Sequence, residues 1–265
     1  MSRRSGPVEL NTHIAHPARM YDYYLGGKDN FAADREAAEE ALRSAPEIRD
    51  IARENRAFMQ RAVRFLVASG IRQFLDIGAG LPTQRNAHEV AQEFAPDARV
   101  VYVDNDPIVL VHARALLAGY GQGQTKVITA DARDPQAILG DPDVRKLIDF
   151  SRPMATMFIS VLQFIPDMDP EDIVGPLREE MAPGSYLAIS HPTQDFRKDE
   201  VLKVADTYTR AKAPAVPRTR AEIERVFGGF EFVDPGLVQV PLWRNEGPIF
   251  DLDRIWMYGG VARKP

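Results

Sequence analysis

Cysteine is absent from this chain of 265 residues, and basic residues are not in excess. Without thiols, the sequence excludes a disulfide framework and a zinc site built on thiolates. The formal net charge of -5 argues against nucleic acid as the main partner. No apolar run reaches the length of a membrane span, and the opening residues, MSRRSGPVEL, lack the apolar core of a secretory signal. We therefore expect a soluble, cytoplasmic protein with no membrane partner.

Histidine is also scarce, with five residues in the chain. His13 and His16 are three positions apart and could share one face of a helix. A histidine pair without a third ligand is usually structural or exposed. The sequence therefore predicts no metal site.

The remaining composition is typical of a globular protein, with 45% hydrophobic and 27% charged residues. The length allows one large α/β domain or two small ones. A leader rich in tyrosine and glycine precedes a region in which short apolar stretches alternate with helical patterns. We expect residues 1–45 to form an N-terminal arm or lid and residues 46–265 to form the main domain.

The most informative stretch reads DIGAG, from Asp76 to Gly80. It follows a short apolar run that suits a buried strand. Gly78, Ala79 and Gly80 form a turn in which the backbone can approach a ligand closely. Strand, glycine turn and a following helix make a site for the polar part of a nucleotide-like ligand. Asp76 disfavours a pyrophosphate and suits an ammonium group, which indicates S-adenosylmethionine rather than a dinucleotide.

Two further acids end or follow predicted strands. Asp104 closes the run RVVYVD, where doubly wound folds carry an acid that accepts hydrogen bonds from ribose hydroxyls. Asn105 follows it, and we include both among the cofactor-binding residues. Asp131 follows the run KVITA and can accept a hydrogen bond from an adenine amine, while the backbone of Ala132 serves the ring. Three acids on one sheet edge form a more specific signal than any of them alone.

The N-terminal leader supports two interpretations. Tyr23, Lys28 and Asn30 belong either to a packing arm or to a lid that contacts the cofactor. Arg56 lies on a predicted helix over residues 46–69. It is either a solvated surface residue or a partner for a ligand carboxylate.

The predicted fourth and fifth strands contribute the acceptor side. Ser160 and Gln163 follow the fourth strand, where the sulfonium of the cofactor should lie. His191 follows the fifth strand and is a weak candidate for a catalytic base, and the alternative is that it caps the turn before the next proline. We expect Tyr208, in an insertion over residues 193–218, to wall the acceptor pocket and Trp243 to close it.

Several longer motifs resemble one bacterial family. DIGAG, VYVD and ITAD are similar to the first three ligand motifs of class I S-adenosylmethionine-dependent methyltransferases. HPARMYDYYLGGKDNFAAD, DIGAGLPTQRNAHEVAQ, LQFIPD, GSYLAISH and YGGVARKP resemble the S-adenosyl methyltransferase family, formerly a domain of unknown function. In many members of that family a His-Phe pair stands where this chain reads LQF, so no histidine is available at Gln163.

The resemblance implies a fold and a cofactor but no acceptor. The implied fold is α/β: a Rossmann-like class I methyltransferase with a seven-stranded, mostly parallel sheet, helices on both faces and an N-terminal helical arm. The implied cofactor is S-adenosyl-L-methionine. Gly78 and Gly80 would lie under its methionine moiety and Asp76 would serve its amino group, while Asp104 and Asp131 keep the roles given above.

The same residues bear on alternative functions. A NAD-dependent dehydrogenase requires a third small residue where Thr83 stands. DNA amino-methyltransferases resemble one another in an Asn/Asp-Pro-Pro-aromatic motif, and here that place reads SVLQFIPD. A protein that binds S-adenosylmethionine without transferring its methyl group stays open. We expect a methyltransferase acting on a small, partly apolar acceptor, and the sequence does not give the oligomeric state.

Overall fold

The computed structural model describes residues 11–82, 85–117, 124–249 and 251–265. Eight strands form one sheet at its centre, in the order β3-β2-β1-β4-β5-β8-β6, and β7 pairs with β8 off this path. The first five strands are parallel to one another, whereas β8 runs antiparallel to β5, β6 and β7. The strands are β1 (Gln73–Ile77), β2 (Arg99–Asp104), β3 (Thr125–Thr129), β4 (Ala155–Ile159), β5 (Tyr186–Pro192), β6 (Glu231–Phe232), β7 (Val238–Gln239) and β8 (Met257–Arg263).

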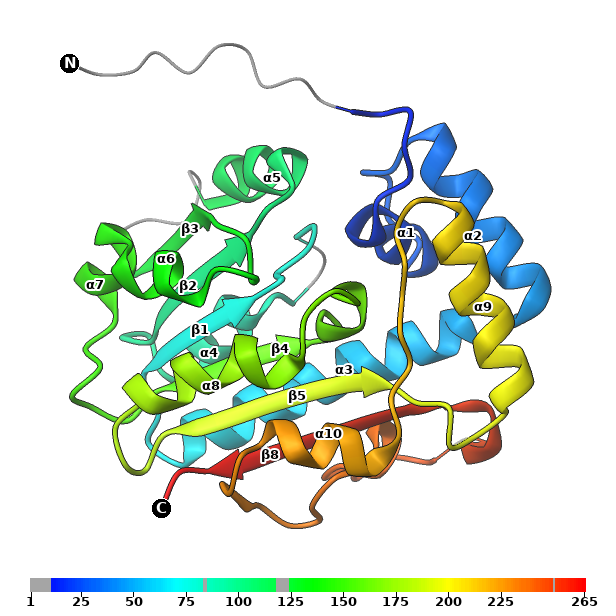
Figure 1. Ribbon diagram of the computed structural model, residues 1–265. Helices are drawn as coiled ribbons and strands as arrows, with labels where there is room; N and C mark the ends of the chain where they lie inside the picture. Colours follow the sequence, from blue (N-terminus) through cyan, green and yellow to red (C-terminus); the bar gives the residue numbers. More distant parts are fainter. Residues whose placement is uncertain (1–10, 83–84, 118–123, 250) are drawn as a thin grey trace, which may run out of the picture.

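Helices cover both faces of this sheet (Figure 1). Successive side chains of a strand point to opposite faces. Phe74 and Val100 therefore belong to the core cluster under α3, α4 and α5, whereas Leu75 and Val101 belong to the cluster under α6, α7, α8 and α10. The helices are α1 (Pro17–Tyr24), α2 (Ala32–Ser44), α3 (Ile48–Ala68), α4 (Ala87–Phe94), α5 (Pro107–Leu117), α6 (Pro135–Gly140), α7 (Pro142–Leu147), α8 (Pro170–Glu180), α9 (Lys198–Arg210) and α10 (Arg220–Val226).

The sheet has eight strands where seven were expected, because one predicted strand near the end of the chain is divided into two. The run from Phe230 to Val240, which reads as one strand, forms the two short strands β6 and β7. Between them Pro235 has no N–H to donate to a ladder. Gly236 then adopts a φ of 88° and donates its N–H to the carbonyl of Val233 at 2.7 Å. The chain turns there, and both pieces still pair with β8.

Three helices form a roof at the carboxyl edge of the parallel strands (Figure 1). They are α1 and α2 from the predicted arm and α9 from the predicted insertion. Tyr208 of α9 shares a hydrogen bond of 3.1 Å with the hydroxyl of Tyr24 on α1. Arg210 of α9 forms an ion pair of 2.7 Å with Glu40 of α2. Segments far apart in sequence are thus joined above the sheet, whereas the division of the chain at residue 45 stays a prediction.

None of the helices in the described part of the chain is long and apolar enough to cross a membrane. The expectation that Trp243 closes the acceptor pocket is wrong, because its side chain is fully buried in the core. It packs edge-to-face against Phe58 at 5.4 Å and Phe65 at 5.9 Å, between ring centroids.

Candidate active site

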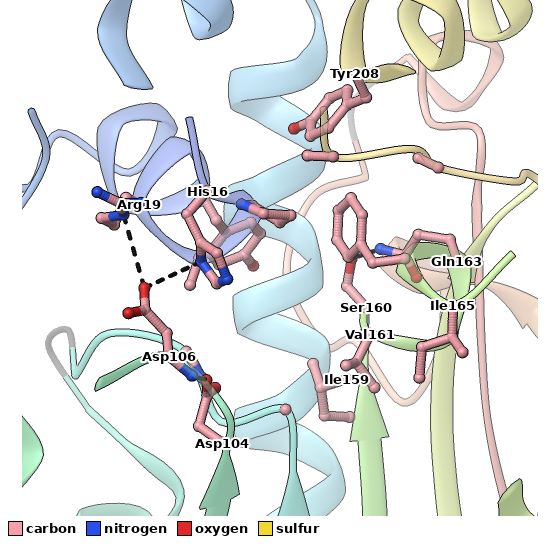
Figure 2. Close-up of a pocket in the computed structure, with 18 of the residues that line it drawn as sticks. His16, Arg19, Asp104, Asp106, Ile159, Ser160, Val161, Gln163, Ile165 and Tyr208 are labelled. Carbon is pink, nitrogen blue, oxygen red and sulfur yellow. Dashed lines mark hydrogen bonds and ion pairs between the residues drawn. The ribbon is translucent and has the colours of Figure 1, made fainter. Parts of the chain in front are cut away.

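A cavity of about 900 Å³ lies between the carboxyl edge of the sheet and the roof. Parallel α/β sheets bind ligands at this edge, where the loops after the strands diverge. Figure 2 shows its two sides: His16, Arg19, Asp104 and Asp106 on one, and Ser160, Gln163 and Tyr208 on the other. We call the part lined by the ends of β1, β2 and β3 the polar end, and the part between α3, α9 and the exit of β4 the apolar end.

The glycine turn after β1 forms the floor of the polar end. Gly78 has a φ of 73° and Gly80 a φ of 66°, conformations that favour glycine. A Cβ on Gly78 would lie 2.1 Å from Cγ2 of Val161, so the turn and the exit of β4 fit together only without a side chain here. Gly78 and Ala79 both donate their N–H to the carbonyl of Val103, at 2.8 and 3.2 Å. The turn is therefore held rigidly against the end of β2.

Asp104 lies next to this turn, as predicted from the end of its strand. Its carboxylate accepts hydrogen bonds from the backbone N–H of Gly80 at 2.8 Å and of Asp106 at 2.9 Å. Burial raises the pKa of Asp104, and the two backbone donors oppose that rise. Each oxygen has a second lone pair, so the carboxylate can still accept from a diol.

Asp76 and Arg56 face the same region with opposite charges. Asp76 is buried at the end of β1, and this burial raises its pKa to about 7, an effect that Arg56 opposes and Asp104 reinforces. Arg56 comes from α3 and donates to Oδ1 of Asn86 at 2.8 Å. Within the described residues, Nε of Arg56 has no hydrogen-bond partner. A carboxyl and a guanidinium set in this way match the ammonium and the carboxylate of an amino acid.

The far side of the polar end carries Asp131 and Ala132. Asp131 accepts the backbone N–H of Arg133 at 2.9 Å and the side-chain amide of the exposed Asn105 at 3.3 Å. Arg133 also bridges Asp131, at 3.3 Å, and Asp167, at 3.2 Å. The structure thus brings Asn105, Asp131 and Ala132 together on the cavity wall.

Sequence reasoning missed an ionic cluster of His16, Arg19, Asp34 and Asp106 beside this site. Asp106 lies 3.2 Å from Nδ1 of His16 and 3.6 Å from Nε of Arg19, as Figure 2 shows. Arg19 also lies 3.5 Å from Asp34, whose side chain is fully buried. The cluster fastens α1 to the end of β2. The spacing of His13 and His16 was visible in the sequence, but nothing in the sequence indicated that the carboxylate of Asp106 lies beside His16.

Three residues expected to cover the cofactor do not line the cavity. The hydroxyl of Tyr23 donates to Glu39, and its ring lies under Arg49. Lys28 is exposed, whereas Asn30 is buried and its side-chain amide donates a hydrogen bond of 2.8 Å to Asp22. The helical period explains this correction: the cavity-facing side of α1 carries Tyr21 and Tyr24, so their neighbour Tyr23 faces α2.

Ser160 and Gln163 lie at the boundary between the two ends. Ser160 has a φ of 57°, a conformation that costs about 1 kcal/mol outside glycine. The side-chain amide of Gln163 donates to the Ser160 hydroxyl at 2.7 Å. In the part of the chain that the structure describes, Oε1 of Gln163 is buried and has no partner. Strain and an unpaired buried acceptor together are typical of a functional position.

The hypothesis that His191 is a catalytic base is wrong. His191 is buried behind the cavity wall and is not among the residues that line the cavity. Nδ1 contacts the carbonyl of Pro192 at 2.7 Å, and Nε2 contacts Nη1 of Arg218 at 2.8 Å. Burial first, and then Arg218, lower the pKa of His191 to about 3. Both ring nitrogens are occupied, so this histidine cannot take a proton from an acceptor.

The arrangement around His191 has a structural role instead. Arg218 also donates to the carbonyl of Leu162 at 3.1 Å, and Val216 donates its N–H to the carbonyl of Gln163 at 2.8 Å. The 3-10 turn over Leu162–Phe164 is therefore held by the segment that follows α9. His191 orients Arg218, which helps to hold the backbone of this turn in place.

The apolar end has a different lining. Hydrophobic and aromatic side chains predominate there, and they come from α1, α3, α9, the exit of β4 and the start of β8. The predicted wall residue Tyr208 is among them, and its ring centroid lies 5.6 Å from that of Phe164. Trp256 lines the cavity, where Trp243 was expected.

The residues present fit an adenosyl amino acid. The turn at Gly78 has no room for a side chain, the Asp76 and Arg56 pair matches a zwitterion, and Asp104 retains free lone pairs beside the turn. Small-molecule pockets typically have volumes of about 300–1,000 Å³. At about 900 Å³, this cavity has room for a cofactor and a small acceptor together.

Comparison with known proteins agrees with this geometry. A family model described as S-adenosyl methyltransferase matches residues 3–265. The structure of a proposed methyltransferase from Thermobifida fusca YX is 46% identical, has a TM-score of 0.92, and is matched over 97% of this chain and 98% of that chain. The structure of a DUF574 family protein from Streptomyces avermitilis MA-4680 is 46% identical with a TM-score of 0.91, over 97% and 100%. A comparison with curated proteins finds no match.

These findings confirm the expected fold, cofactor and class of activity. The match extends over nearly the whole chain, so it includes the roof as well as the sheet. The chain belongs to the S-adenosyl methyltransferase family and is a Rossmann-like, S-adenosylmethionine-dependent methyltransferase.

Proposed function

We propose that the polar end of the cavity binds S-adenosylmethionine and that the apolar end binds a small acceptor. The assignment places the ribose hydroxyls on Asp104 and the adenine beside Asp131 and Ala132. The amino and carboxylate groups of the methionine moiety lie on Asp76 and Arg56. His16 and Arg19, on the roof, close the site above Asp104.

The observation that carries this proposal is the buried Asp76 opposite Arg56, on the strand next to that of Asp104. An acid with a raised pKa at a strand end costs free energy, and a bound ammonium group offsets that cost. Among the described residues Asp76 forms no ion pair, and Arg56 supplies the positive charge that opposes the rise of its pKa. A ligand that brings its own ammonium and carboxylate completes the pair.

When bound, the cofactor supplies a methyl group on a sulfonium, which is an activated leaving group. The protein therefore needs to align the acceptor and to exclude water. Ser160 and Gln163 lie at the boundary of the two ends, where an acceptor meets the methyl group. The strained turn at Ser160 fixes the direction of Gln163 and so the position of the acceptor.

The acceptor that fits best is a small molecule rather than nucleic acid. Among the described residues, the cavity lining has no row of basic side chains that could follow a phosphate backbone. Its apolar end is lined mainly by hydrocarbon and aromatic surface, which suits a partly apolar metabolite. A cytoplasmic location stays a prediction.

Titration calorimetry with S-adenosylmethionine tests the proposal. We expect one site with a dissociation constant in the micromolar range, on the order of -8 kcal/mol. Asp104→Asn should weaken binding by about 1–3 kcal/mol, because the hydroxyls lose a charged acceptor. Asp134→Asn, in the N-cap of α6, is the matched control and should bind like the wild type. An absence of binding by the folded protein would overturn the proposal.

A second assay separates transfer from binding. The protein is incubated with S-adenosylmethionine carrying a labelled methyl group and with a panel of small apolar acceptors. We expect labelled product and S-adenosylhomocysteine in equal amounts. Binding without transfer to any acceptor would indicate a protein that holds the cofactor without using it.

A further inference from the structure

The apolar end of the cavity is almost free of charge. Of the described residues that line it, Lys212 is charged but exposed, and Arg56 lies at the boundary, bonded to Asn86. A charged acceptor would lose its hydration here without gaining a counterion. The lining therefore selects for an uncharged molecule.

The walls of the apolar end are flat. Phe164 and Tyr208 lie with their rings tilted by 38°, and Trp256 and Tyr24 add further aromatic surface. The hydroxyls of Tyr24 and Tyr208 are bonded to each other, so the rings rather than the hydroxyls define these walls. Aromatic rings pack best against other rings, offset or edge-to-face. A planar aromatic acceptor suits these walls better than a flexible aliphatic one.

Apart from Nε of Arg56 at the boundary, two polar atoms in this lining are buried without a partner among the described residues. They are Oε1 of Gln163 and Nε1 of Trp256. The side chains of both residues are more than nine-tenths buried, and both residues line the cavity. An unpaired buried acceptor is costly, and a ligand that donates a hydrogen bond removes that cost. Gln163 is therefore positioned to bind an O–H or N–H group.

Of the side chains that the structure describes at the apolar end, none can act as a base near neutral pH. Burial raises the pKa of Tyr208 to about 12, and it also raises the pKa of Tyr24 and Tyr21. His191 is bonded through both ring nitrogens outside the cavity. The acceptor must therefore present a nucleophile that does not depend on a basic side chain of this end.

We propose that the apolar end binds an uncharged, planar aromatic acceptor whose O–H or N–H group donates a hydrogen bond to the side-chain carbonyl of Gln163. This inference rests on the proposed function, because it takes the polar end as the cofactor site. It adds the chemical class of the acceptor and the residue that orients it.

The test uses the whole protein saturated with S-adenosylhomocysteine and two sets of probes. Indole and 2-naphthol carry a donor group, indene and naphthalene lack it, and indole-5-carboxylate and 6-hydroxy-2-naphthoate add a negative charge. Equilibrium dialysis measures the affinity of each. We expect indole or 2-naphthol to bind at least tenfold more tightly than its donor-free and its charged counterparts. If neither donor compound shows this preference, the proposal is wrong.

Gln163→Met then tests the residue itself. Methionine keeps the length of the side chain but removes the carbonyl, so the preference for indole over indene should fall to about one. The affinity for indene should stay within about twofold, which separates a lost hydrogen bond from a collapsed pocket. A preference that survives in Gln163→Met would overturn the role of Gln163.

The affinity for S-adenosylhomocysteine distinguishes the two proposals. If the wild type binds S-adenosylhomocysteine but does not discriminate among the aromatic probes, only the acceptor class is wrong. If it does not bind S-adenosylhomocysteine, the proposed function itself fails. The probe series on the wild type decides the acceptor class even if Gln163→Met does not fold.

Discussion

The two ends of the cavity are built in different ways. The polar end consists of residues at the ends of three neighbouring parallel strands or shortly after them, with Asp76, Gly80, Asp104 and Asp131 all on one edge. The apolar end is assembled from α1, α3, α9 and the loops after β4 and before β8. The first depends on strand order, whereas the second depends on how distant segments pack. Variants that affect one end and leave the other intact can test this division.

The largest expected effect concerns the attachment of the roof to the polar end. Arg19→Ala leaves the buried carboxylates of Asp34 and Asp106 without their cation. Breaking a buried ion pair by removing one partner costs about 3–5 kcal/mol. We expect the free energy of unfolding, measured in urea, to fall by about that amount. Arg53→Ala, which removes an exposed pair with Asp50, should cost less than about 1 kcal/mol. Equal effects would show that α1 is not fixed by this cluster.

The next effect concerns the charge at the end of β1. Asp76→Asn removes the partner of the cofactor ammonium and should weaken binding of S-adenosylhomocysteine by about 2–3 kcal/mol. The unliganded protein should become more stable, because burial raises the pKa of Asp76 to about 7. A shift of roughly three pKa units corresponds to about 4 kcal/mol, so we expect a gain of about 2–4 kcal/mol at pH 8.

The sign of this stability effect follows from linkage. An acid whose pKa is raised by folding costs nothing at pH values below its unfolded pKa, and its cost grows until the pH passes the folded pKa of about 7. The stabilisation by Asp76→Asn should therefore vanish near pH 4 and reach its full value near pH 8. Thermal unfolding of both proteins across this range measures it. A variant that is less stable than the wild type at pH 8 would contradict the burial of an ionised Asp76.

A smaller effect is expected from pH alone. The ammonium of the cofactor binds the ionised form of Asp76, so affinity should fall by about tenfold between pH 8 and pH 6 in the wild type. Asp76→Asn should show little dependence over the same range, even though Asp104 also faces this end. Calorimetry in two buffers of different ionisation enthalpy should detect one proton released on binding near pH 6. A flat profile in the wild type would mean that Asp76 does not contact the ammonium.

The smallest effect on the cofactor is expected at the apolar end. Tyr208→Leu removes one aromatic wall and the hydrogen bond to Tyr24. It should weaken binding of aromatic probes by about 1–2 kcal/mol and leave the affinity for S-adenosylhomocysteine within about twofold. A large loss of cofactor affinity in Tyr208→Leu would show that the two ends are not separate.

The same division explains what the sequence could predict. DIGAG, VYVD and ITAD each combine a strand with its terminal residues, so the placement of Asp104, Asp131 and the glycine turn follows from local pattern and parallel order. The mostly parallel sheet with helices on both faces was implied by the resemblance of these motifs to class I methyltransferases. The break at Pro235 and Gly236 was missed, because its effect depends on pairing with β8.

Other residues could not be placed from local pattern. Tyr23 and Tyr24 are adjacent, and only the packing of α1 against α2 decides which of them faces the cavity. His191 stands at a strand end like a catalytic residue, but Arg218, 27 positions later, occupies its second nitrogen. Trp243 does not reach the cavity, because the core around Phe58 buries its indole completely.

A crystal structure with S-adenosylhomocysteine tests the central claim most directly. We expect the ribose hydroxyls within hydrogen-bond distance of Asp104, the ammonium within about 3.2 Å of Asp76, and the sulfur facing Gln163 across the boundary. The apolar end should remain open beside the sulfur. A ligand whose adenosine occupies the apolar end, or whose ammonium lies away from Asp76, would contradict the division of the cavity.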